Sequence, residues 1–129
     1  MADDAQVEIL RQGAAHWNAW RQANPEVAPR LEAGALRGLD LAGADLSQAD
    51  LRGADLRGAI LREANLTDAR LDGANLFKAV LEGAELAGSS LRDAQFLNCA
   101  QIMSARNWQG ADRDETLACG APIPAKEDR

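Results

Sequence analysis

Leucine recurs at every fifth position from Leu31 to Leu91, and Phe96 occupies the next position of the series. From 44 to 94, the residue two places before each of these positions is alanine, except at Ser89. The residue directly before the leucine is often Asp or Asn. This spacing constrains the fold more than any other feature, because it matches neither common secondary structure.

A five-residue period fits neither a helix face nor a strand face. On an α-helix, successive leucines would step by roughly 140° and spread around the axis. On a straight strand they would alternate between the two faces. They can share one interior only if the backbone turns in the same sense after every unit, so that the chain winds into coils. The pattern therefore predicts a solenoid.

The stretch from 39 to 98 reads LDLAG ADLSQ ADLRG ADLRG AILRE ANLTD ARLDG ANLFK AVLEG AELAG SSLRD AQFLN. This repeated A-(D/N)-L-x-x motif resembles the pentapeptide-repeat family, and with the degenerate units around Leu31 and Leu36 the resemblance covers roughly half of the chain. It implies an all-β solenoid, a right-handed quadrilateral β-helix with four pentapeptides in each coil and about three to three and a half coils here.

In such a coil the leucines fill the interior and the alanines point inward beside them. Burying each leucine contributes about 1.5–3 kcal/mol, which makes this ladder the main stabilising contribution. The predicted core comprises Leu41, Leu46, Leu51, Leu56, Leu61, Leu66, Leu71, Leu76, Leu81, Leu86, Leu91 and Phe96.

Residues twenty apart are expected to lie one above another in adjacent coils. Asp50 then stacks on Arg70, and Arg52 on Asp72. Opposite charges stacked in this way contribute about 0.2–1 kcal/mol per pair. A spacing of fifteen also gives matches, such as Asp55 with Arg70, so the charge pattern supports the coil length without establishing it.

Residues 1–28 are predicted to form an N-terminal capping α-helix. Asp3 or Asp4 can begin a helix that runs to about Ala23, and Asn24-Pro25 ends it. Its apolar residues follow helical spacing and are expected to cover the first coil. The alternative is an amphipathic helix for a partner or a membrane, although its acidic residues disfavour anionic lipid. The stripe comprises Val7, Leu10, Ala14, Trp17 and Trp20.

The β-helix is predicted over 29–101, and a C-terminal segment over 102–129. Gln101 would take the leucine position, where burial of an amide is unfavourable unless it is paired. Ile102, Met103 and Trp108 either cover the last coil or mediate a homodimer through this end cap; the sequence leaves both open. We expect a short helix over 112–117 and a flexible tail over 121–129.

Cys99 falls on the small inward position of its unit, which predicts a buried free thiol; a bridge to Cys119 is the alternative. Cytosolic conditions keep thiols reduced. No run of about twenty apolar residues is present, and the acidic N-terminus lacks the features of a signal peptide. We therefore expect a cytoplasmic protein that does not enter the membrane.

Residues that could perform chemistry are scarce. His16 is the single histidine and has no ligand partners at metal-binding spacing. The chain contains no phosphate loop, dinucleotide fingerprint or nucleophile elbow. The repeat itself places the carboxylates, and a tube filled by leucine leaves no cleft that would raise a pKa. We predict no catalytic residue, no metal site, no cofactor and no enzymatic activity.

The first functional hypothesis is a protein–protein interaction module whose partner the sequence does not name. Arg57, Phe77 and Leu97 form an outward column at intervals of twenty, and Ile60 and Val80 form an apolar column on the adjacent wall, continued by Ala100. Exposed apolar columns of this kind mark interfaces. The alternative is that the C-terminal segment covers them.

The second hypothesis is DNA mimicry. The resemblance implies it, because some family members match a B-form duplex in size and negative charge and bind DNA gyrase. The whole chain carries a net charge of −6, but residues 34–98 hold ten acidic and seven basic residues, a net of −3. Arginines interrupt the negative surface, so mimicry is the lesser alternative. The acidic balance also argues against direct nucleic-acid binding.

Overall fold

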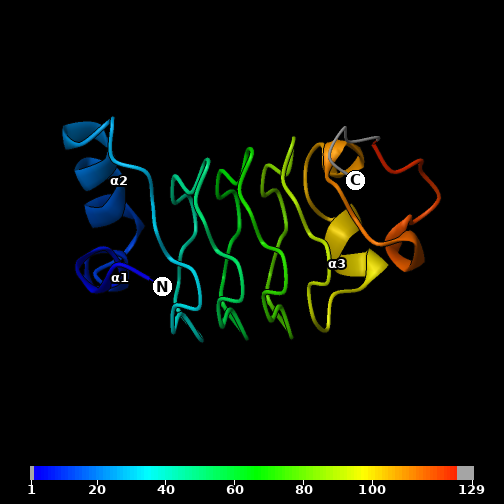
Figure 1. Cartoon of the computed structure of the whole chain (residues 1–129), viewed down its shortest axis with the longest axis horizontal. Coiled ribbons are helices and arrows are strands. Elements are labelled where there is room, and N and C mark those ends of the chain that lie inside the picture. Colours follow the sequence, from blue (N-terminus) through cyan, green and yellow to red (C-terminus); the bar gives the residue numbers. More distant parts are fainter. Residues whose placement is uncertain (1, 125–129) are drawn as a thin grey trace.

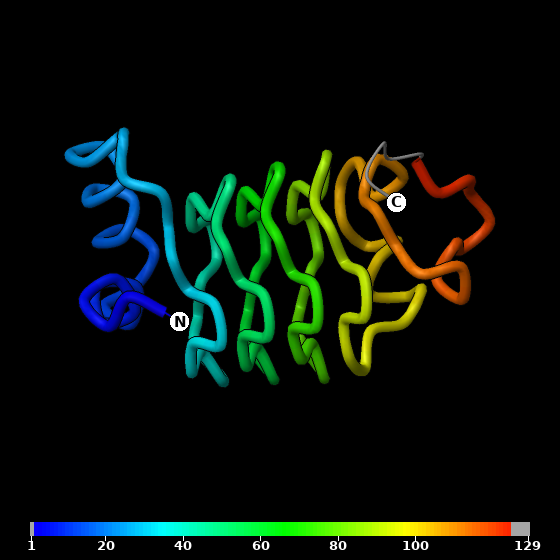
Figure 2. Tube along the Cα trace, viewed as in Figure 1, coloured from blue at the N-terminus to red at the C-terminus, as the bar shows by residue number. Residues whose placement is uncertain are grey.

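Two short helices lie at one end of an elongated stack of coils, and irregular structure with a third helix lies at the other (Figure 1). The structure is a computed structural model that describes residues 2–124. Its helices are α1 (Asp4–Arg11), α2 (Ala14–Ala23) and α3 (Cys99–Met103), followed by the 3-10 turns η1 (Trp108–Gly110) and η2 (Glu115–Leu117). Figure 2 shows the coils following one another along the rod in sequence order.

Each regular coil takes twenty residues, because the parallel bridges from Arg30 to Gln95 join residues twenty apart. The bridges form four columns, which pass through Asp50, Asp55, Ile60 and Asn65. They stay isolated because the chain turns after every unit. The residue two places after each leucine has a positive φ from Ala33 to Asp93, and this repeated left-handed residue makes the turn.

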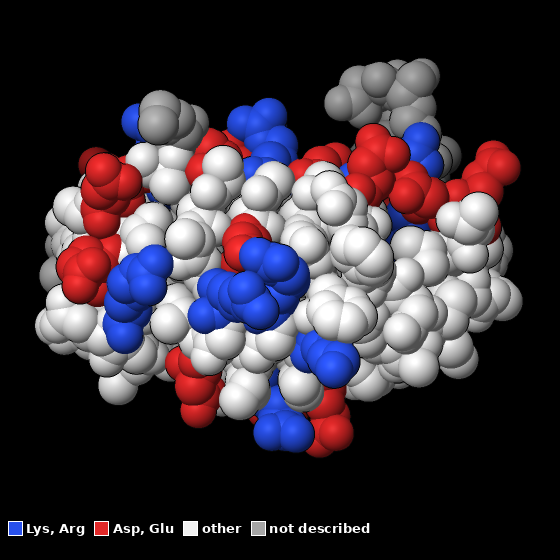
Figure 3. All heavy atoms as spheres, turned by 90° about the horizontal axis from the view of Figure 1, so that it is seen from below, with Lys and Arg blue, Asp and Glu red and all other residues white. Residues whose placement is uncertain are grey.

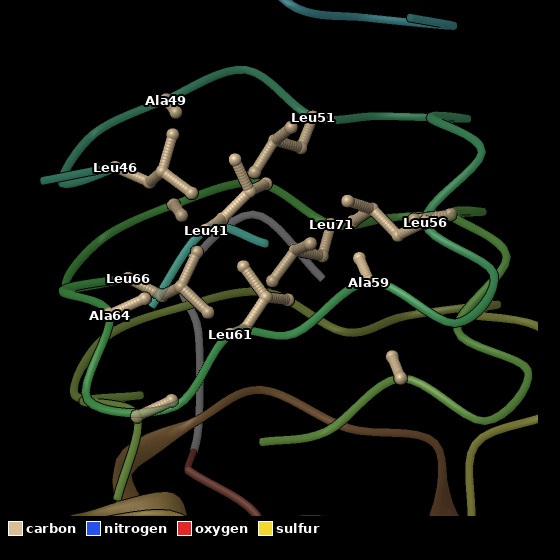
Figure 4. Packing of buried hydrophobic residues seen from close by; sticks show 14 of the residues in the cluster. Leu41, Leu46, Ala49, Leu51, Leu56, Ala59, Leu61, Ala64, Leu66 and Leu71 are labelled. Atoms are coloured by element: carbon tan, nitrogen blue, oxygen red, sulfur yellow. The ribbon is translucent and has the colours of Figure 1, made fainter. Parts of the chain in front are cut away.

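The leucines fill a common interior, as Figure 4 shows for several successive coils. All eleven leucines from Leu41 to Leu91 are at most 2% exposed. The alanines two places before the leucines from Leu46 to Leu86 are buried beside them, where the walls leave room for a methyl group and little more. The core is therefore a single narrow column of aliphatic side chains.

Phe96 does not belong to this core, and its predicted position is wrong. Its side chain is 66% exposed, and its backbone has a φ of 58°, whereas no leucine of the series has a positive φ. The chain therefore leaves the wall directly after Gln95, and the ring points outward. Leu97, predicted to face outward, is half-buried and packs against the core. The register thus shifts by one residue where the regular coils end.

The N-terminal segment forms two helices rather than the single helix predicted. Gly13 separates α1 from α2 with a φ of 107°, a conformation that glycine adopts at little cost. Asp3 caps α1, and its carboxylate accepts hydrogen bonds from the amides of Ala5 and Gln6 at 3.0 and 3.2 Å. Leu10 and Trp17 are fully buried, so both helices contribute to the core.

Side chains of α2 satisfy backbone groups at the open edge of the first coil. The indole Nε1 of Trp17 and the guanidinium of Arg21 each donate to the carbonyl of Asp45 at 2.7 Å. Asn18 donates to the carbonyl of Gly43 at 3.0 Å and accepts from the amide of Asp45 at 2.7 Å. An open sheet edge exposes such groups, and here the helix pairs them.

Beyond Gln95 the chain makes a detour and then returns to the ladder. Asn98 and Gln101 form a capping box at the start of α3. The Gln101 amide donates to the carbonyls of Leu76 and Ala79 at 2.9 and 3.0 Å, which supplies the partners its burial requires. Arg106 and Asp112 then extend two of the bridge columns, so the ladder continues past the predicted end of the β-helix at residue 101.

Cys99 and Cys119 form a disulfide with a Cα–Cα distance of 5.5 Å, so the prediction of a free thiol is wrong. The unit at Cys99 has become helical, and α3 directs this residue toward the segment after η2 instead of into the tube. The helix predicted over 112–117 is shortened to η2.

Arg113 organises the rest of the C-terminal segment. It is fully buried and donates to the carbonyls of Trp108, Leu117 and Ala111 at 2.7, 2.9 and 3.0 Å. It also donates to the carbonyls of Ala121 and Pro122, which belong to the predicted tail. Residues 125–129 of that tail lie outside the described residues. Within residues 2–124, no helix is long and apolar enough to cross a bilayer.

Candidate functional site

The predicted surface residues lie around one corner of the coil stack. Arg57 and Phe77 each follow a leucine in adjacent coils, and the amide of Gly58 donates to the carbonyl of Phe77 at 2.8 Å. Ile60 and Val80 form a parallel bridge on the next wall, where both are half-buried. Ala100 lies in α3 and does not extend their column as predicted. Phe77 is 46% exposed, so the C-terminal segment, as far as it is described to residue 124, does not cover it.

Phe96 joins this surface, although the sequence placed it in the core. Its ring meets that of Phe77 edge-on, with 5.6 Å between centroids and 69° between planes. The ammonium of Lys78 lies 5.3 Å from the centroid of Phe77. We call Phe77, Lys78 and Phe96 the aromatic corner. The sequence carried one signal that Phe96 leaves the core. The Asn98-x-x-Gln101 pattern, which begins two residues after Phe96, is a capping box and indicates that the repeat ends and a helix begins.

A cleft of about 430 Å³ opens beside the aromatic corner. Two of its polar lining residues are already engaged: Gln101 bonds the backbone of the coil below, and Asn98 accepts from the Gln101 amide at 2.9 Å. The groups left to face a ligand are therefore mainly aromatic and aliphatic, together with the Lys78 ammonium and the side-chain nitrogen of Asn98. The lining comprises Phe77, Lys78, Ala79, Phe96, Leu97, Asn98 and Gln101, none of which is acidic.

An arginine–aspartate pair borders this surface. The Nε and NH2 atoms of Arg57 donate to the two carboxylate oxygens of Asp55 at 2.8 and 2.7 Å. These hydrogen bonds lower the pKa of Asp55 to about 2, and the charge of Arg37 acts in the same direction. The pKa of Arg57 is raised in return by the bond to Asp55.

The same pairing occurs on the neighbouring wall, where Arg52 binds Asp50 at 2.6 Å and lowers its pKa. The predicted stacking at intervals of twenty is confirmed for the backbone by the Asp50–Arg70 bridge. The bidentate ion pairs, however, form between residues two apart. They do so because an Arg directly after the leucine lies beside the Asp directly before it.

The surroundings of the aromatic corner are positive on a negative chain. Lys78 lies at the cleft, Arg57 pairs with Asp55, and the charge of Arg37 also acts on Asp55. Asp40 adjoins Ile60 on the next wall, and the whole chain carries a net charge of −6. Figure 3 shows one face of the rod on which Lys and Arg side chains gather over the central coils beside uncharged surface.

A larger hollow, of about 610 Å³, lies on the wall that passes through Arg70 and Ser90. Acidic and basic side chains alternate there, and the Ser90 hydroxyl donates to the carboxylate of Asp72 at 2.8 Å. The two basic and three acidic side chains of its lining nearly balance in charge, and Arg52 and Asp112 form ion pairs with Asp50 and Arg92 beside it. Among residues 2–124, no group of three or more His, Cys, Asp or Glu is arranged to hold a metal ion.

The family model for pentapeptide repeats matches residues 40–76 and 69–100, with eight copies of the repeat. The chain belongs to the pentapeptide-repeat family. Proteins of this family form β-helices and are generally structural or interaction proteins rather than enzymes. No curated protein matches the chain.

Two solved structures are similar to this pentapeptide-repeat chain. The pentapeptide repeat protein Rfr23 from the cyanobacterium Cyanothece 51142 is 35% identical over 67% of this chain, with a TM-score of 0.51. The pentapeptide repeat protein alr5209 from Nostoc PCC 7120 is 37% identical over 67% of this chain, also with a TM-score of 0.51. The chain spans 50% of the first protein and 62% of the second.

Proposed function

We propose that this chain is a non-enzymatic scaffold that binds a partner protein through the aromatic corner and the adjoining Arg57, Ile60 and Val80. The right-handed, quadrilateral β-helix with its helical N-terminal cap is part of this proposal. One observation carries it: Phe77 and Phe96 stand exposed beside a cleft without acidic residues, on a wall fixed by inter-coil bridges.

Aromatic side chains suit this role because they bury a large area and lose little conformational freedom on binding. The wall beneath Phe77 is bonded to its neighbours by the repeating ladder, so the surface is organised before a partner arrives. Organising a surface in advance reduces the cost of association. The half-buried pair of Ile60 and Val80 extends the apolar area around the corner.

DNA mimicry gains no support from the arrangement of charges. A mimic needs carboxylates that present a continuous negative surface, whereas Asp50 and Asp55 are each neutralised by a bidentate arginine. A supercoiling assay with DNA gyrase tests this alternative directly. We expect no inhibition at micromolar protein, and inhibition would replace the interaction module with the mimic.

The binding surface can be tested by affinity capture from the native cell with three baits: wild type, Phe77→Asp and Ala42→Asp. Ala42 occupies the same place in its repeat as Phe77 and is exposed, so it controls for a new carboxylate at that position. We expect partners to be lost with Phe77→Asp and retained with Ala42→Asp. Equal capture by all three baits would remove this surface from the proposal.

The homodimer through an end cap stays a prediction of the sequence. Light scattering after size exclusion measures the mass directly. Met103 is an exposed apolar residue of α3, so Met103→Asp should dissociate a dimer that forms through this cap. A dimer that persists in this variant would place the contact elsewhere.

A further inference from the structure

We propose that the aromatic corner binds an acidic segment of a partner protein that inserts an apolar side chain into the cleft beside Phe77 and Phe96. This inference rests on the proposed function and adds to it the chemistry of the partner. Three observations on the described residues support it: the local charge, the conformation of Phe96 and the lining of the cleft.

The charge around the corner selects the sign of the partner. Lys78 lies at the cleft, and Arg57 precedes Phe77 in the column. Asp55 cancels one of these charges through its bond to Arg57, which leaves Lys78 and Arg37 to act outward. An acidic segment complements this surface, and complementary charge raises both association rate and specificity.

Phe96 is held in a conformation that disfavours a side chain. Its φ of 58° lies in the left-handed region, where a residue with a Cβ costs about 1–2 kcal/mol relative to the right-handed one. The residue is also 66% exposed, so little burial offsets that cost. Other residues with side chains adopt this conformation at the turns of the repeat, among them Lys78 with a φ of 59°. Phe96 differs from them because the conformation leaves a large apolar ring exposed, for which a partner can supply the missing contacts. Glycine would relieve the strain but would leave nothing for a partner to contact.

The cleft selects an apolar anchor over a polar one. Its volume of about 430 Å³ falls within the range of small ligand sites. The Gln101 side chain is bonded to the fold, and the side-chain oxygen of Asn98 accepts from the backbone amide of Gln101. Apart from the Asn98 side-chain nitrogen and the Lys78 ammonium, the polar side chains of the lining therefore offer an entering polar group no partner to replace the water it loses. The larger hollow near Arg70 lacks both the apolar lining and the excess of positive charge, because its lining is charged and nearly balanced in sign.

Selection from a displayed library of random twelve-residue peptides tests the proposal on the full chain. We expect the recovered peptides to combine Asp or Glu with one aromatic or aliphatic residue. Single-stranded oligo-dT is included as a competitor, because a cationic aromatic surface also suits stacked bases. Peptides without acidic enrichment, no enrichment at all, or displacement of the peptides by oligo-dT would each overturn the inference.

Two substitutions assign the binding to its residues without disturbing the fold. Phe77→Ala places at this position a residue that the repeat already carries at Ala42 and Ala87. Lys78→Glu matches Glu63, which has the same place in its unit and a φ of 58°. For a recovered acidic peptide, we expect the Kd to rise about tenfold with Phe77→Ala and about fivefold with Lys78→Glu. Unchanged affinity in both variants would place the peptide elsewhere and refute the site.

The salt dependence separates this inference from the function on which it rests. Capture of partner proteins that bind through an acidic segment should weaken as ionic strength rises, because salt screens the attraction between that segment and the cationic surface. Partners that are lost with Phe77→Asp but bind equally well at high salt would keep the interaction module and refute the acidic partner. Partners that do not depend on Phe77 would refute both.

Discussion

The two ends of the coil stack solve the same problem by different means. Each end exposes backbone groups and leucine side chains that lack a further coil to cover them. At the N-terminal end, α1 and α2 cover the first coil with Trp17 and pair its edge through side chains, without a covalent link. At the C-terminal end the chain itself returns to the ladder and is then closed by a buried arginine and a disulfide.

This difference determines how each end should fail. The N-terminal cap depends on the buried side chains of Leu10 and Trp17 and on a few hydrogen bonds, so its loss should expose the first coil directly. The C-terminal cap is a closed loop around Arg113, so its segments should loosen together. In a solenoid each repeat contacts only its neighbours, and damage at one end therefore reaches the other weakly. The predictions that follow test this independence.

The largest effect is expected from Trp17→Ala. It removes a fully buried indole and its 2.7 Å bond to Asp45, and we expect a loss of about 3–5 kcal/mol in the free energy of unfolding. Trp17→Phe keeps most of the packing and loses the bond, at about 1 kcal/mol. Denaturant unfolding gives both values. Hydrogen exchange should accelerate in the coil of residues 30–49 and stay unchanged beyond residue 96; equal acceleration at both ends would refute independence.

Arg113→Met is expected to cost about 3 kcal/mol, because several buried carbonyls lose their donor together. Burial lowers the pKa of Arg113, and the charge of Asp112 opposes that shift. Arg62→Met at an exposed position serves as the matched control and should change stability by less than about 0.5 kcal/mol. In Arg113→Met, the protection of backbone amides from hydrogen exchange should fall across residues 106–122. An Arg113→Met protein as stable as the control would show that the carbonyls find other donors.

Opening the disulfide is expected to cost about 2–3 kcal/mol, since it closes a loop with a sequence separation of 20. Cys99→Ser with Cys119→Ser should match the reduced wild type in denaturant unfolding, and the N-terminal exchange rates should not change. A reduced protein as stable as the oxidised one would mean that Arg113 alone closes this end.

The bridge also makes the expected cytoplasmic location testable, because a cytosolic chain would carry both thiols reduced. Alkylation of the protein in lysed native cells, followed by mass measurement, counts the free thiols. Two free thiols in the native cell would agree with the cytoplasm, and a bridged pair would favour an oxidising compartment.

The same contrast explains what the sequence could predict. Each leucine from Leu41 to Leu91 repeats one local constraint, so the period alone predicts a turning chain with a leucine interior, and the family resemblance supplies the length of the coil. The two ends depend on contacts that occur once. Nothing near Arg113 signals its burial, because its partners come from several segments of the C-terminal region. Phe96 has a residue type suited to the core, and its backbone conformation alone turns it outward. Gly13 and the Asn98–Gln101 capping box were readable signals of the breaks at each end.

The smallest effect is expected in the coils between the two ends, from Asp55→Asn. Arg57 holds the pKa of Asp55 at about 2 in the fold, below its ordinary 3.8. The folded state therefore binds this proton less readily than the unfolded chain. The stabilisation is present above pH 3.8 and is lost as the pH falls toward 2. Because the pair is partly exposed and screened, its contribution stays below about 1 kcal/mol.

In denaturant titrations, the free energy of unfolding of the wild type should thus fall by this amount between pH 4 and pH 2. The free energy of unfolding of Asp55→Asn should not show this part of the pH dependence. The exchange rates at the two ends should be the same in both proteins at pH 7, since Asp55 contacts neither cap. A shift in either cap would mean that the central coils transmit the change, and the two ends would then have to be treated as one cooperative unit.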